Sequence, residues 1–418
     1  MTDRSLVAPL MPEVDFGVDP IEDFYERTAA LQATGRRVAP VRFNGGLAWL
    51  ILKHADLAEA YSDEEGLPAA PAYERHTVPI EGRTLLAMTG EEHRIQRALV
   101  SAVFQPAAIR RLVDRILVPV ANALIDRFQG QKQVDLATAF ARLYPFSVIS
   151  HMLTIPIDDE QQVIDWVFMM LRYFWEPEKA MAARAELDAY VQPIVEARRR
   201  DPGDDIISRL TVAEVEGHRL TEDQILTFVR VLYPAGAETT FLAISGMMFE
   251  ILSNPEVLGR LRARPQGRPA AVEESLRKAG PLAVLPRFTE AAVTIAGVDI
   301  PANSWLLYGN GPAGHDADQF RDPEIFSLDR AGNRHLAFGK GPHFCIGAHL
   351  AREEMRIALS LLLDRLPGLR LVEGETVKIT GTGGILRGAY RLPVTFDAVL
   401  PAMDYTQPEK KWQVGASG

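Results

Sequence analysis

The chain has 418 residues, 47% hydrophobic and 24% charged, which is the composition of an ordinary globular protein with a sizeable core. Its net charge of −10, from 45 Lys and Arg against 55 Asp and Glu, argues against a nucleic-acid-binding protein, because neutralising phosphates requires a basic face. The single cysteine excludes an internal disulfide and fits a reducing cytoplasm.

The N-terminal residues 1–23 carry several acidic side chains and lack a basic start followed by an apolar run, so we expect no signal peptide. The uncharged stretch 239–249 is too short to span a bilayer. We therefore expect a cytoplasmic, bacterial protein without a membrane anchor. We also expect one large domain over residues 1–402 and a polar tail over residues 403–418.

The predicted elements are mostly helical, with a small β part near the N-terminus. Apolar residues alternate on both sides of Asn44-Gly45 and predict a β-hairpin within residues 41–51, since Asn-Gly adopts the positive torsions of a tight turn. Helical spacing of apolar residues then predicts helices over residues 92–104, 107–128, 159–174, 179–199, 221–252 and 347–366. The expected fold class is mainly α with a small β region.

The most informative segment, residues 338–347, reads FGKGPHFCIG around the only cysteine. Glycines allow positive torsions and close approach to a flat ligand. Cys345 lies just before a predicted helix, whose N-terminal dipole and free N–H groups favour the iron-binding thiolate. A lone cysteine is more often a small buried residue than a ligand, but this glycine-rich setting favours the ligand.

The segment resembles the cysteine loop of the cytochrome P450 family. Every fixed position of that loop is satisfied, by Phe338, Gly339, Gly341, His343, Cys345 and Gly347. The resemblance implies that Cys345 is the metal ligand of heme b (iron protoporphyrin IX). In the family, electron donation from the thiolate favours cleavage of the O–O bond of oxygen. It also implies that Phe338 packs beside the sulfur and that His343 reaches a haem propionate. The fold implied is that of the family: a helical triangular prism with the haem between two long helices.

Further landmarks of the family occur in the expected order. His93 and Arg97, four residues apart, resemble the propionate-binding helix, and Arg287 matches the remaining propionate arginine. From spacing alone, His93 and Arg97 fit an exposed polar face equally well. If the resemblance holds, two arginines and two histidines clamp two carboxylates by charge-assisted hydrogen bonds.

Glu274 and Arg277, three residues apart, can pair on one helical face, although such pairs are common on exposed helices. In the family this pair is buried and joined by a further arginine before the cysteine loop, which Arg330 matches. We therefore assign Glu274, Arg277 and Arg330 structural roles, since a buried charge without its partner is costly.

Ala235-Gly236-Ala237-Glu238-Thr239 lies in the middle of the predicted helix 221–252 and matches the oxygen-activating helix of the family. Small residues and threonines also occur where helices pack closely, which is the alternative interpretation. The resemblance implies that Ala235 borders the haem and that Glu238 and Thr239 are catalytic, delivering protons during oxygen activation. The resemblance also implies a distorted helix beside the haem. Pro234, which departs from the commonest family sequence and lacks an N–H, reinforces that opening, and the sequence leaves the local geometry open.

The substrate pocket is expected from positions that line it in the family. These are Leu85, Phe168, Leu232, Ala235, Leu282, Val284, Ile385 and Leu386. Each of them fits a core position about equally well. Together they indicate an apolar substrate such as a terpenoid, steroid, fatty acid or aromatic compound.

The predicted function is a haem-thiolate monooxygenase that hydroxylates or epoxidises an apolar small molecule with O2 and electrons from NAD(P)H. One cysteine cannot ligate an iron–sulfur cluster, so we expect a separate ferredoxin or flavodoxin with its reductase to supply the electrons. We expect the chain itself to be a monomer. Arg94, Arg111, Lys340 and Arg352 are candidate contacts for that partner. The alternatives are a peroxide-using or electron-independent haem-thiolate enzyme, against which Glu238 and Thr239 count, and a haem-based sensor or carrier.

Overall fold

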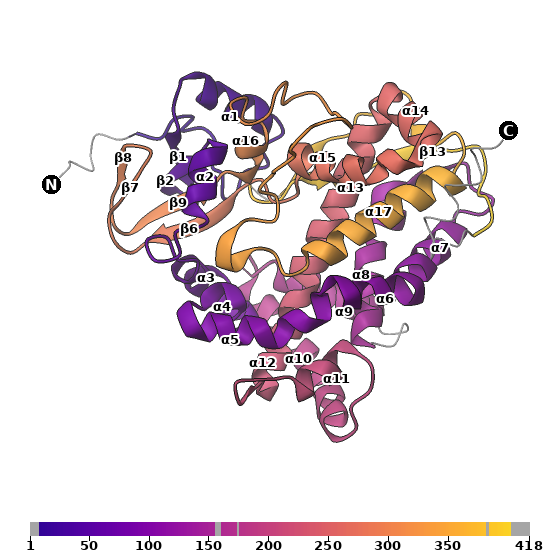
Figure 1. Ribbon diagram of the computed structural model, residues 1–418, viewed down its shortest axis with the longest axis horizontal. Helices are drawn as coiled ribbons and strands as arrows, with labels where there is room; N and C mark the ends of the chain where they lie inside the picture. Colours follow the sequence, from indigo (N-terminus) through magenta and orange to yellow (C-terminus); the bar gives the residue numbers. More distant parts are fainter. Residues whose placement is uncertain (1–7, 155–159, 174, 382–383, 403–418) are drawn as a thin grey trace. The chain divides into compact units, whose positions relative to one another are not determined.

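The computed structural model describes residues 8–154, 160–173, 175–381 and 384–402 (Figure 1). The predicted polar tail, residues 403–418, lies outside the described residues. The chain passes more than once between two compact units. Unit 1 comprises Met1–Ala72, Leu242–Cys345 and Leu371–Pro393, and unit 2 comprises Tyr73–Phe241, Ile346–Arg370 and Val394–Gly418.

Unit 1 is built around a four-stranded sheet in the order β1-β2-β9-β6. β1 (Val38–Phe43) and β2 (Gly46–Ile51) form the predicted hairpin, and its turn residues have positive φ, 49° at Asn44 and 78° at Gly45. β9 (Ser304–Tyr308) pairs parallel to β2, and β6 (Leu285–Thr289) pairs antiparallel to β9. The prediction of a small β region is confirmed.

Short helices and small hairpins complete unit 1. Its helices are α1 (Phe24–Ala33), α2 (His54–Ala60), α14 (Pro255–Ala263), α15 (Arg268–Ala279) and α16 (Asn310–Gly314). Its other strands are β7 (Val293–Ile295), β8 (Val298–Ile300), β11 (Ile379–Thr380) and β12 (Gly388–Ala389). A core of fully buried apolar side chains, such as Phe16, Phe24 and Leu50, packs against the sheet.

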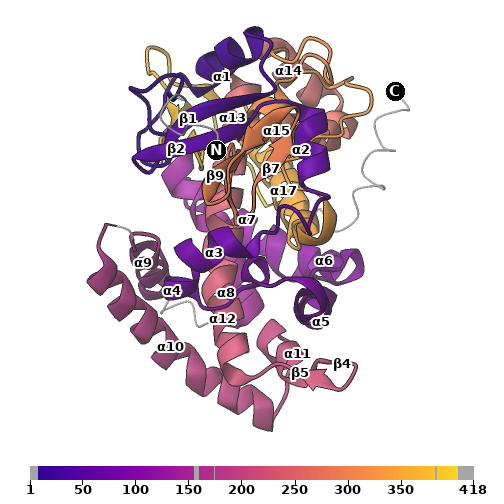
Figure 2. The ribbon, with the colours of Figure 1, turned by 90° about the vertical axis from the view of Figure 1, so that its left-hand side faces the viewer.

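Unit 2 is mainly helical, and α9 lies beside α10 (Figure 2). Its helices are α4 (Val78–Glu81), α5 (Gly90–Ser101), α6 (Pro106–Leu112), α7 (Val118–Asp126), α8 (Leu143–Leu153), α9 (Glu160–Met170), α10 (Pro177–Arg200), α11 (Ile206–Val212), α12 (Glu222–Tyr233) and α17 (Ala348–Arg365). Its strands are β3 (Gln133–Asp135), β4 (Glu214–Val215) and β5 (His218–Arg219). The remaining elements, α3 (Ala70–His76), α13 (Thr239–Leu252), β10 (Arg370–Leu371) and β13 (Pro393–Thr395), each include a boundary between the units.

The predicted helices are present, and two of them contain π-helical turns. The helix expected over residues 107–128 is interrupted by the π-helical segment η4 (Val113–Leu117), just before Pro119, which has no N–H to continue a regular ladder. The helix expected over residues 221–252 contains η7 (Pro234–Glu238), also π-helical, between α12 and α13. The distorted helix that the resemblance implied is thus present, and it begins at Pro234.

Within the described residues, no single helix is long and apolar enough to cross a membrane. The helical segments Glu222–Leu252 and Pro255–Ala263 reach that length and apolar character only when they are counted together, and the chain bends by 100° between them.

Candidate active site

The cysteine loop of unit 1 has the backbone that its glycines predict. Gly339 and Gly341 have φ of 68° and 74°, in the left-handed region. A Cβ on Gly341 would lie 2.5 Å from the backbone oxygen of Tyr61, so the loop approaches this chain segment only because the position is glycine. The Cys345 N–H donates to the Phe338 carbonyl at 2.9 Å, and Cys345 itself is exposed. The loop therefore presents its sulfur on a restrained backbone.

Gly347 ends this loop as the residue before α17, which begins at Ala348. Cys345 lies three residues before that helix. The N-terminal N–H groups and the helix dipole favour negative charge at such a position. The location thus suits a cysteine that is used as thiolate.

Two cationic or potentially cationic side chains of unit 1 belong to the predicted propionate set. Arg287 lies on β6, is 4% exposed, and its guanidinium carbon is 4.6 Å from the centre of the Tyr308 ring. His343 Nε2 lies 3.0 Å from Glu64 Oε1, and its side chain is 6% exposed. The hydrogen bond to Glu64 is a contact that the sequence did not suggest.

Unit 2 carries the other predicted propionate residues on α5. His93 is 5% exposed, and Arg97, one turn later, is half-buried. The Arg97 carbonyl accepts a hydrogen bond of 2.6 Å from Ser101 Oγ. The spacing of these two residues also fitted an exposed polar face. Because His93 is buried, α5 does not present such a face at this position.

The predicted catalytic pair lies at the end of η7. Thr239 Oγ1 donates a hydrogen bond of 2.7 Å to the carbonyl of Ala235, and Ala235 itself is exposed. Burial raises the pKa of the Glu238 carboxyl to about 7, although the positive charge of Arg142 opposes the shift. A carboxyl with this pKa can both give and accept a proton near neutrality.

Sequence analysis missed two side chains near this pair. Arg142 precedes α8, and its guanidinium carbon lies 4.1 Å from the centre of the Phe168 ring. Glu354 of α17 is 1% exposed and hydrogen-bonds the Thr240 side chain, while burial raises the pKa of its carboxyl well above the ordinary value. No local pattern marks either residue, because Arg142 lies over a ring of α9 and Glu354 meets Thr240 only through the packing of separate helices.

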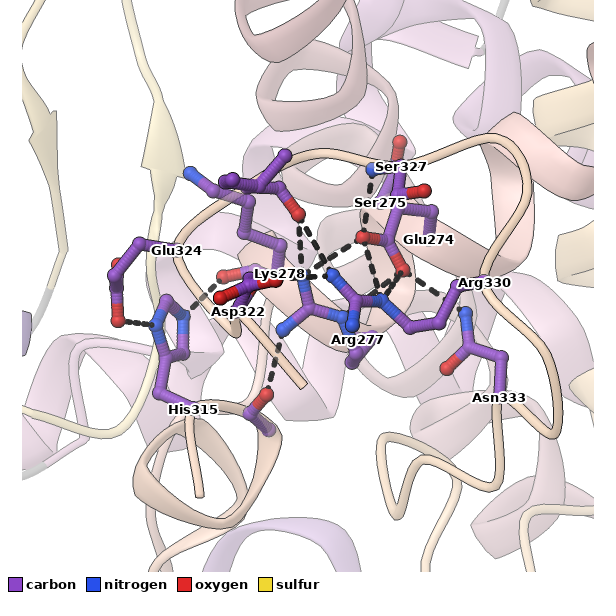
Figure 3. A network of polar contacts seen from close by, with 12 residues as sticks. Glu274, Ser275, Arg277, Lys278, His315, Asp322, Glu324, Ser327, Arg330 and Asn333 are labelled. Carbon is purple, nitrogen blue, oxygen red and sulfur yellow. Dashed lines mark hydrogen bonds and ion pairs between the residues drawn. The ribbon is translucent and has the colours of Figure 1, made fainter. Parts of the chain in front are cut away.

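The predicted structural residues of unit 1 form a connected network (Figure 3). Glu274 accepts two hydrogen bonds from Arg277, at 2.9 and 2.8 Å, and two from Arg330 Nε, at 3.0 and 2.9 Å. The Ser327 N–H and Asn333 Nδ2 donate to the same carboxylate, at 3.0 and 3.2 Å. Burial alone would raise the pKa of Glu274, but these donors outweigh it and hold the pKa below the ordinary value.

The predicted substrate residues are divided between the units. In unit 1, Leu282 and Leu386 form an antiparallel bridge, and the Ala283 N–H donates to the Ile385 carbonyl at 2.9 Å. These contacts bring the segment after Pro281 beside residues 385–386, while Val284 is fully buried in the core. In unit 2, Leu232 is 8% exposed, and Leu85 and Phe168 are half-buried.

The residues present fit a haem group by their chemistry. Cys345 offers an accessible sulfur in a loop whose glycines lie against Tyr61, and the flanking Phe338 and Phe344 supply apolar rings 6.4 Å apart. Arg287 and His343 of unit 1, and His93 and Arg97 of unit 2, are donors suited to carboxylates. A thiolate with such cations is the donor set that an iron porphyrin with two propionates requires.

Comparisons with known proteins agree with this donor set. The family model described as Cytochrome P450 matches residues 22–264 and 269–391. The chain is 35% identical over 361 residues to the mycinamicin IV hydroxylase/epoxidase of Micromonospora griseorubida, which covers 84% of this chain and 90% of the relative. It is similar in structure to cytochrome P450 CYP109Q5 of Chondromyces apiculatus, with a TM-score of 0.83, 29% identity, and coverage of 92% of this chain and 97% of the other. It also resembles CYP109E1 of Bacillus megaterium in complex with testosterone, with a TM-score of 0.81, 29% identity, and coverage of 89% and 99%.

Proposed function

This chain belongs to the cytochrome P450 family and is a haem-thiolate monooxygenase with heme b as its cofactor, and on that basis we propose a role for each residue of its site. Cys345 is the metal ligand. Phe338, Gly339 and Gly347 shape the loop that carries it. The observation that supports this assignment best is the restrained, exposed cysteine on a loop with two positive-φ glycines.

When bound, the haem iron supplies the binding and reductive activation of O2. His93, Arg97, Arg287 and His343 bind the propionates, and Ala235 leaves room beside the porphyrin because its side chain is a single methyl group. For His343 this requires sharing or replacing its hydrogen bond to Glu64. Charge-assisted hydrogen bonds from these donors orient the porphyrin in the site.

Glu238 and Thr239 deliver the protons that splitting an O–O bond consumes. The Thr239 hydroxyl donates its hydrogen bond to the Ala235 carbonyl. Its oxygen can therefore still accept a hydrogen bond from a neighbouring water. Glu238, with a pKa of about 7, exchanges protons with solvent at neutral pH and passes them toward Thr239. Proton transfer from a positioned group contributes about 10²–10⁴-fold to a rate.

The substrate is an apolar small molecule that is hydroxylated or epoxidised. The nominated residues Leu85, Phe168, Leu232, Leu282 and Ile385 present only hydrocarbon surface, which binds such a molecule by excluding water. Two relatives support this class by name, one as a hydroxylase/epoxidase and one in complex with testosterone. Terpenoids, steroids, fatty acids and aromatic compounds are the classes to test first.

Electrons come from NAD(P)H through a separate ferredoxin or flavodoxin and its reductase, and the enzyme works as a cytoplasmic monomer. Arg111 and Lys340 are exposed, Arg352 is half-buried, and Arg94 is bound by Glu216 through two hydrogen bonds of 2.8 Å. Arg94 is therefore the weakest of the four candidate contacts, because an acidic partner has to displace Glu216.

The experiment that tests the function is a turnover screen of apolar compounds with the haem-loaded enzyme, a ferredoxin–reductase pair and NAD(P)H, with products identified by mass spectrometry. An oxygenated product that depends on both O2 and NAD(P)H is the expected result. Compounds that bind but are never oxygenated, with no NAD(P)H consumed under any partner, would instead indicate a sensor or carrier.

A further inference from the structure

Arg230 of α12 is buried where this helix meets α4 and α10, all of them in unit 2. It is 1% exposed. Its Nε donates to the Glu81 carbonyl of α4 at 2.9 Å, and its Nη1 donates to Asp188 Oδ2 of α10 at 2.7 Å. Its Nη2 donates to Thr227 Oγ1, within α12, at 2.6 Å. Because the donors of a guanidinium lie in one rigid plane, these bonds fix the positions of the three helices relative to one another.

Arg184 of α10 adds a second contact of the same kind. It lies one turn before Asp188, and its Nε is 3.7 Å from the Asp188 Oδ2 atom that also binds Arg230. Arg184 Nη1 donates to the Pro79 carbonyl of α4 at 3.0 Å. The carbonyls of the last helical turn have no partner within their own helix. Asp188 therefore joins two arginines, each of which binds α4 at a carbonyl that α4 leaves unbonded.

Gly82 follows α4 and lets it lie this close to α12. Its φ is 93°, in the left-handed region. A Cβ at this position would lie 2.6 Å from Thr227 Oγ1 and 3.0 Å from Arg230 Nη2, so a larger residue would force the chain away from α12. Three residues after Gly82, the short helix η2 (Leu85–Ala87) begins. The contacts of α4 therefore also determine where Leu85 lies.

A second carboxylate, Asp223, also contacts Arg230, but it cannot replace Asp188. The Asp223 side chain is 81% exposed and lies 3.4 Å from Arg230 Nη2, whereas the Asp188 side chain is 25% exposed and lies at 2.7 Å. Exposed ion pairs are weak, while a buried guanidinium depends strongly on its close partner. Arg184, Asp188 and Arg230 thus form one unit, called here the arginine clamp, and Asp223 stands outside it.

We propose that Arg230 is a positioning residue for substrate selection: through the arginine clamp it holds the segment 77–87 against α12 and so limits the size of the apolar molecule that fits between Leu85 and Leu232. The inference rests on the proposed roles of these two leucines as substrate residues. Leu232 belongs to the same helix as Arg230, and Leu85 follows the helix that the clamp binds. Arg230 acts through α4 and does not itself contact the substrate.

The clamp discriminates by size because only a bulky molecule requires the segment 77–87 to move outward. Such a movement breaks hydrogen bonds to a buried charge, which have no water to replace them. A small molecule leaves the same bonds intact. The clamp therefore weakens the binding of bulky molecules and has little effect on the binding of small ones.

The first test compares two azoles of different size on the haem-loaded protein. Imidazole and the bulky triaryl azole clotrimazole both bind haem iron through an imidazole nitrogen, and the Soret band reports the binding. In Asp188→Asn the ratio of the clotrimazole Kd to the imidazole Kd should fall about 3–10-fold, part of the roughly 10–200-fold discrimination that an apolar pocket reaches. Arg230→Lys should give the same result, because lysine keeps the charge but lacks the planar fork.

The second test needs neither haem nor substrate. Amide hydrogen exchange in residues 77–87 reports how often this segment leaves its packed position. Exchange there should be faster in Asp188→Asn and in Arg230→Lys, by a factor similar to the change in the azole ratio. The matched control is Asp223→Asn, which removes an equal charge from the same arginine and should leave both the exchange and the azole ratio as in the wild type.

The possible failures are distinct. Unchanged exchange in Asp188→Asn and in Arg230→Lys would overturn the arginine clamp itself. Faster exchange with an unchanged azole ratio would overturn its role in selection. An unchanged azole ratio in Leu85→Ala would instead overturn the proposed substrate role of Leu85. If Asp188→Asn and Arg230→Lys do not fold, Arg184→Gln, which breaks only the half-buried contact with the Pro79 carbonyl and the longer contact with Asp188, should change both measurements in the same directions.

Discussion

Arg330 and Glu274 lie 56 positions apart in the chain, yet Arg330 Nε donates to both oxygens of the Glu274 carboxylate, at 3.0 and 2.9 Å. The Glu274 side chain is fully buried, and the Arg330 side chain is 8% exposed. A carboxylate that is buried and shared in this way depends on every donor around it, because no water replaces a lost partner.

Arg330→Met should therefore destabilise the fold by about 3–5 kcal/mol, since it leaves a buried charge short of a partner. The free energy of unfolding in urea measures this. The matched control is Arg260→Met, which breaks the exposed pair with Asp329 at 2.9 Å and should cost less than about 1 kcal/mol. Equal losses in the two variants would contradict a structural role for the Glu274 network.

The same network should make stability depend on acid. Because the folded-state pKa of Glu274 lies below its ordinary value, its contribution is complete above the unfolded-state pKa and is lost as the pH falls through the folded-state pKa. Unfolding measured between pH 7 and pH 3 should therefore show a steeper acid loss in the wild type than in Glu274→Gln. Parallel curves for the two proteins would rule out this contribution.

Cys345→Ala should lose the thiolate signature of the haem. In the reduced, CO-bound wild type, thiolate ligation gives a strongly red-shifted Soret band, and the variant has no sulfur to provide it. Absorbance spectra of both proteins after haem reconstitution provide the measurement. A wild-type band at the position of histidine-ligated haem would refute the assignment of Cys345.

Thr239→Ala should separate oxygen consumption from product formation. Without the hydroxyl, NAD(P)H is still consumed but much of the flux leaves as hydrogen peroxide, whereas Glu238→Ala slows turnover by about 10²-fold or more. Product and peroxide per NAD(P)H are measured together. Thr239→Ser retains the hydroxyl and should stay coupled; equal uncoupling in the serine and alanine variants would mean that the hydroxyl is not what matters.

Glu81 should give the stability of unit 2 a second dependence on pH. Burial raises the pKa of its carboxyl to about 7, against the opposing effects of Thr77 and Arg230. Between the ordinary pKa and about 7 the folded protein holds a proton that the unfolded chain has lost, so stability falls as the pH rises through this range. Glu81→Gln should remove about 1–3 kcal/mol of the loss between pH 5 and pH 8, measured by urea unfolding.

The control for this prediction is Glu92→Gln. Glu92 is hydrogen-bonded by Arg83, which lowers its pKa, so it stays ionised above pH 5 in both the folded and unfolded states. Its replacement should leave the slope between pH 5 and pH 8 as in the wild type. A Glu81→Gln slope that matches the wild type would show that Glu81 is not the titrating group.

Electron transfer should depend on charge at Arg111 and Arg352. α6, which carries Arg111, contacts α17, which carries Arg352, so the two side chains belong to neighbouring helices of unit 2. The double charge reversal to Glu should slow reduction by an acidic ferredoxin at low salt and weaken the salt dependence of that rate. Arg200→Glu, at the exposed end of α10, is the control; if it has the same effect, only net charge is involved.

Local sequence patterns predicted the elements that local chemistry determines. The Asn44-Gly45 turn, the helix after Gly347 and the distortion at Pro234 each depend on residues next to one another in the chain. The pairing of Glu274 with Arg330 followed from the family resemblance, since nothing in residues 274–330 alone brings these two side chains together. His343 binding Glu64, Arg142 lying over Phe168 and Glu354 meeting Thr240 were missed, because each depends on tertiary packing between distant segments.

The π-helical turn at Pro234–Glu238 has a consequence for engineering this helix. A π turn accommodates one more residue than an α turn, and one residue of an α-helix corresponds to a rotation of about 100°. Removing a single residue from 234–238 would turn every later side chain of α13 by that angle, taking Thr239 away from the Ala235 carbonyl and Thr240 away from Glu354. The number of residues in this turn, and not only their identity, therefore determines the directions in which Thr239 and Thr240 point.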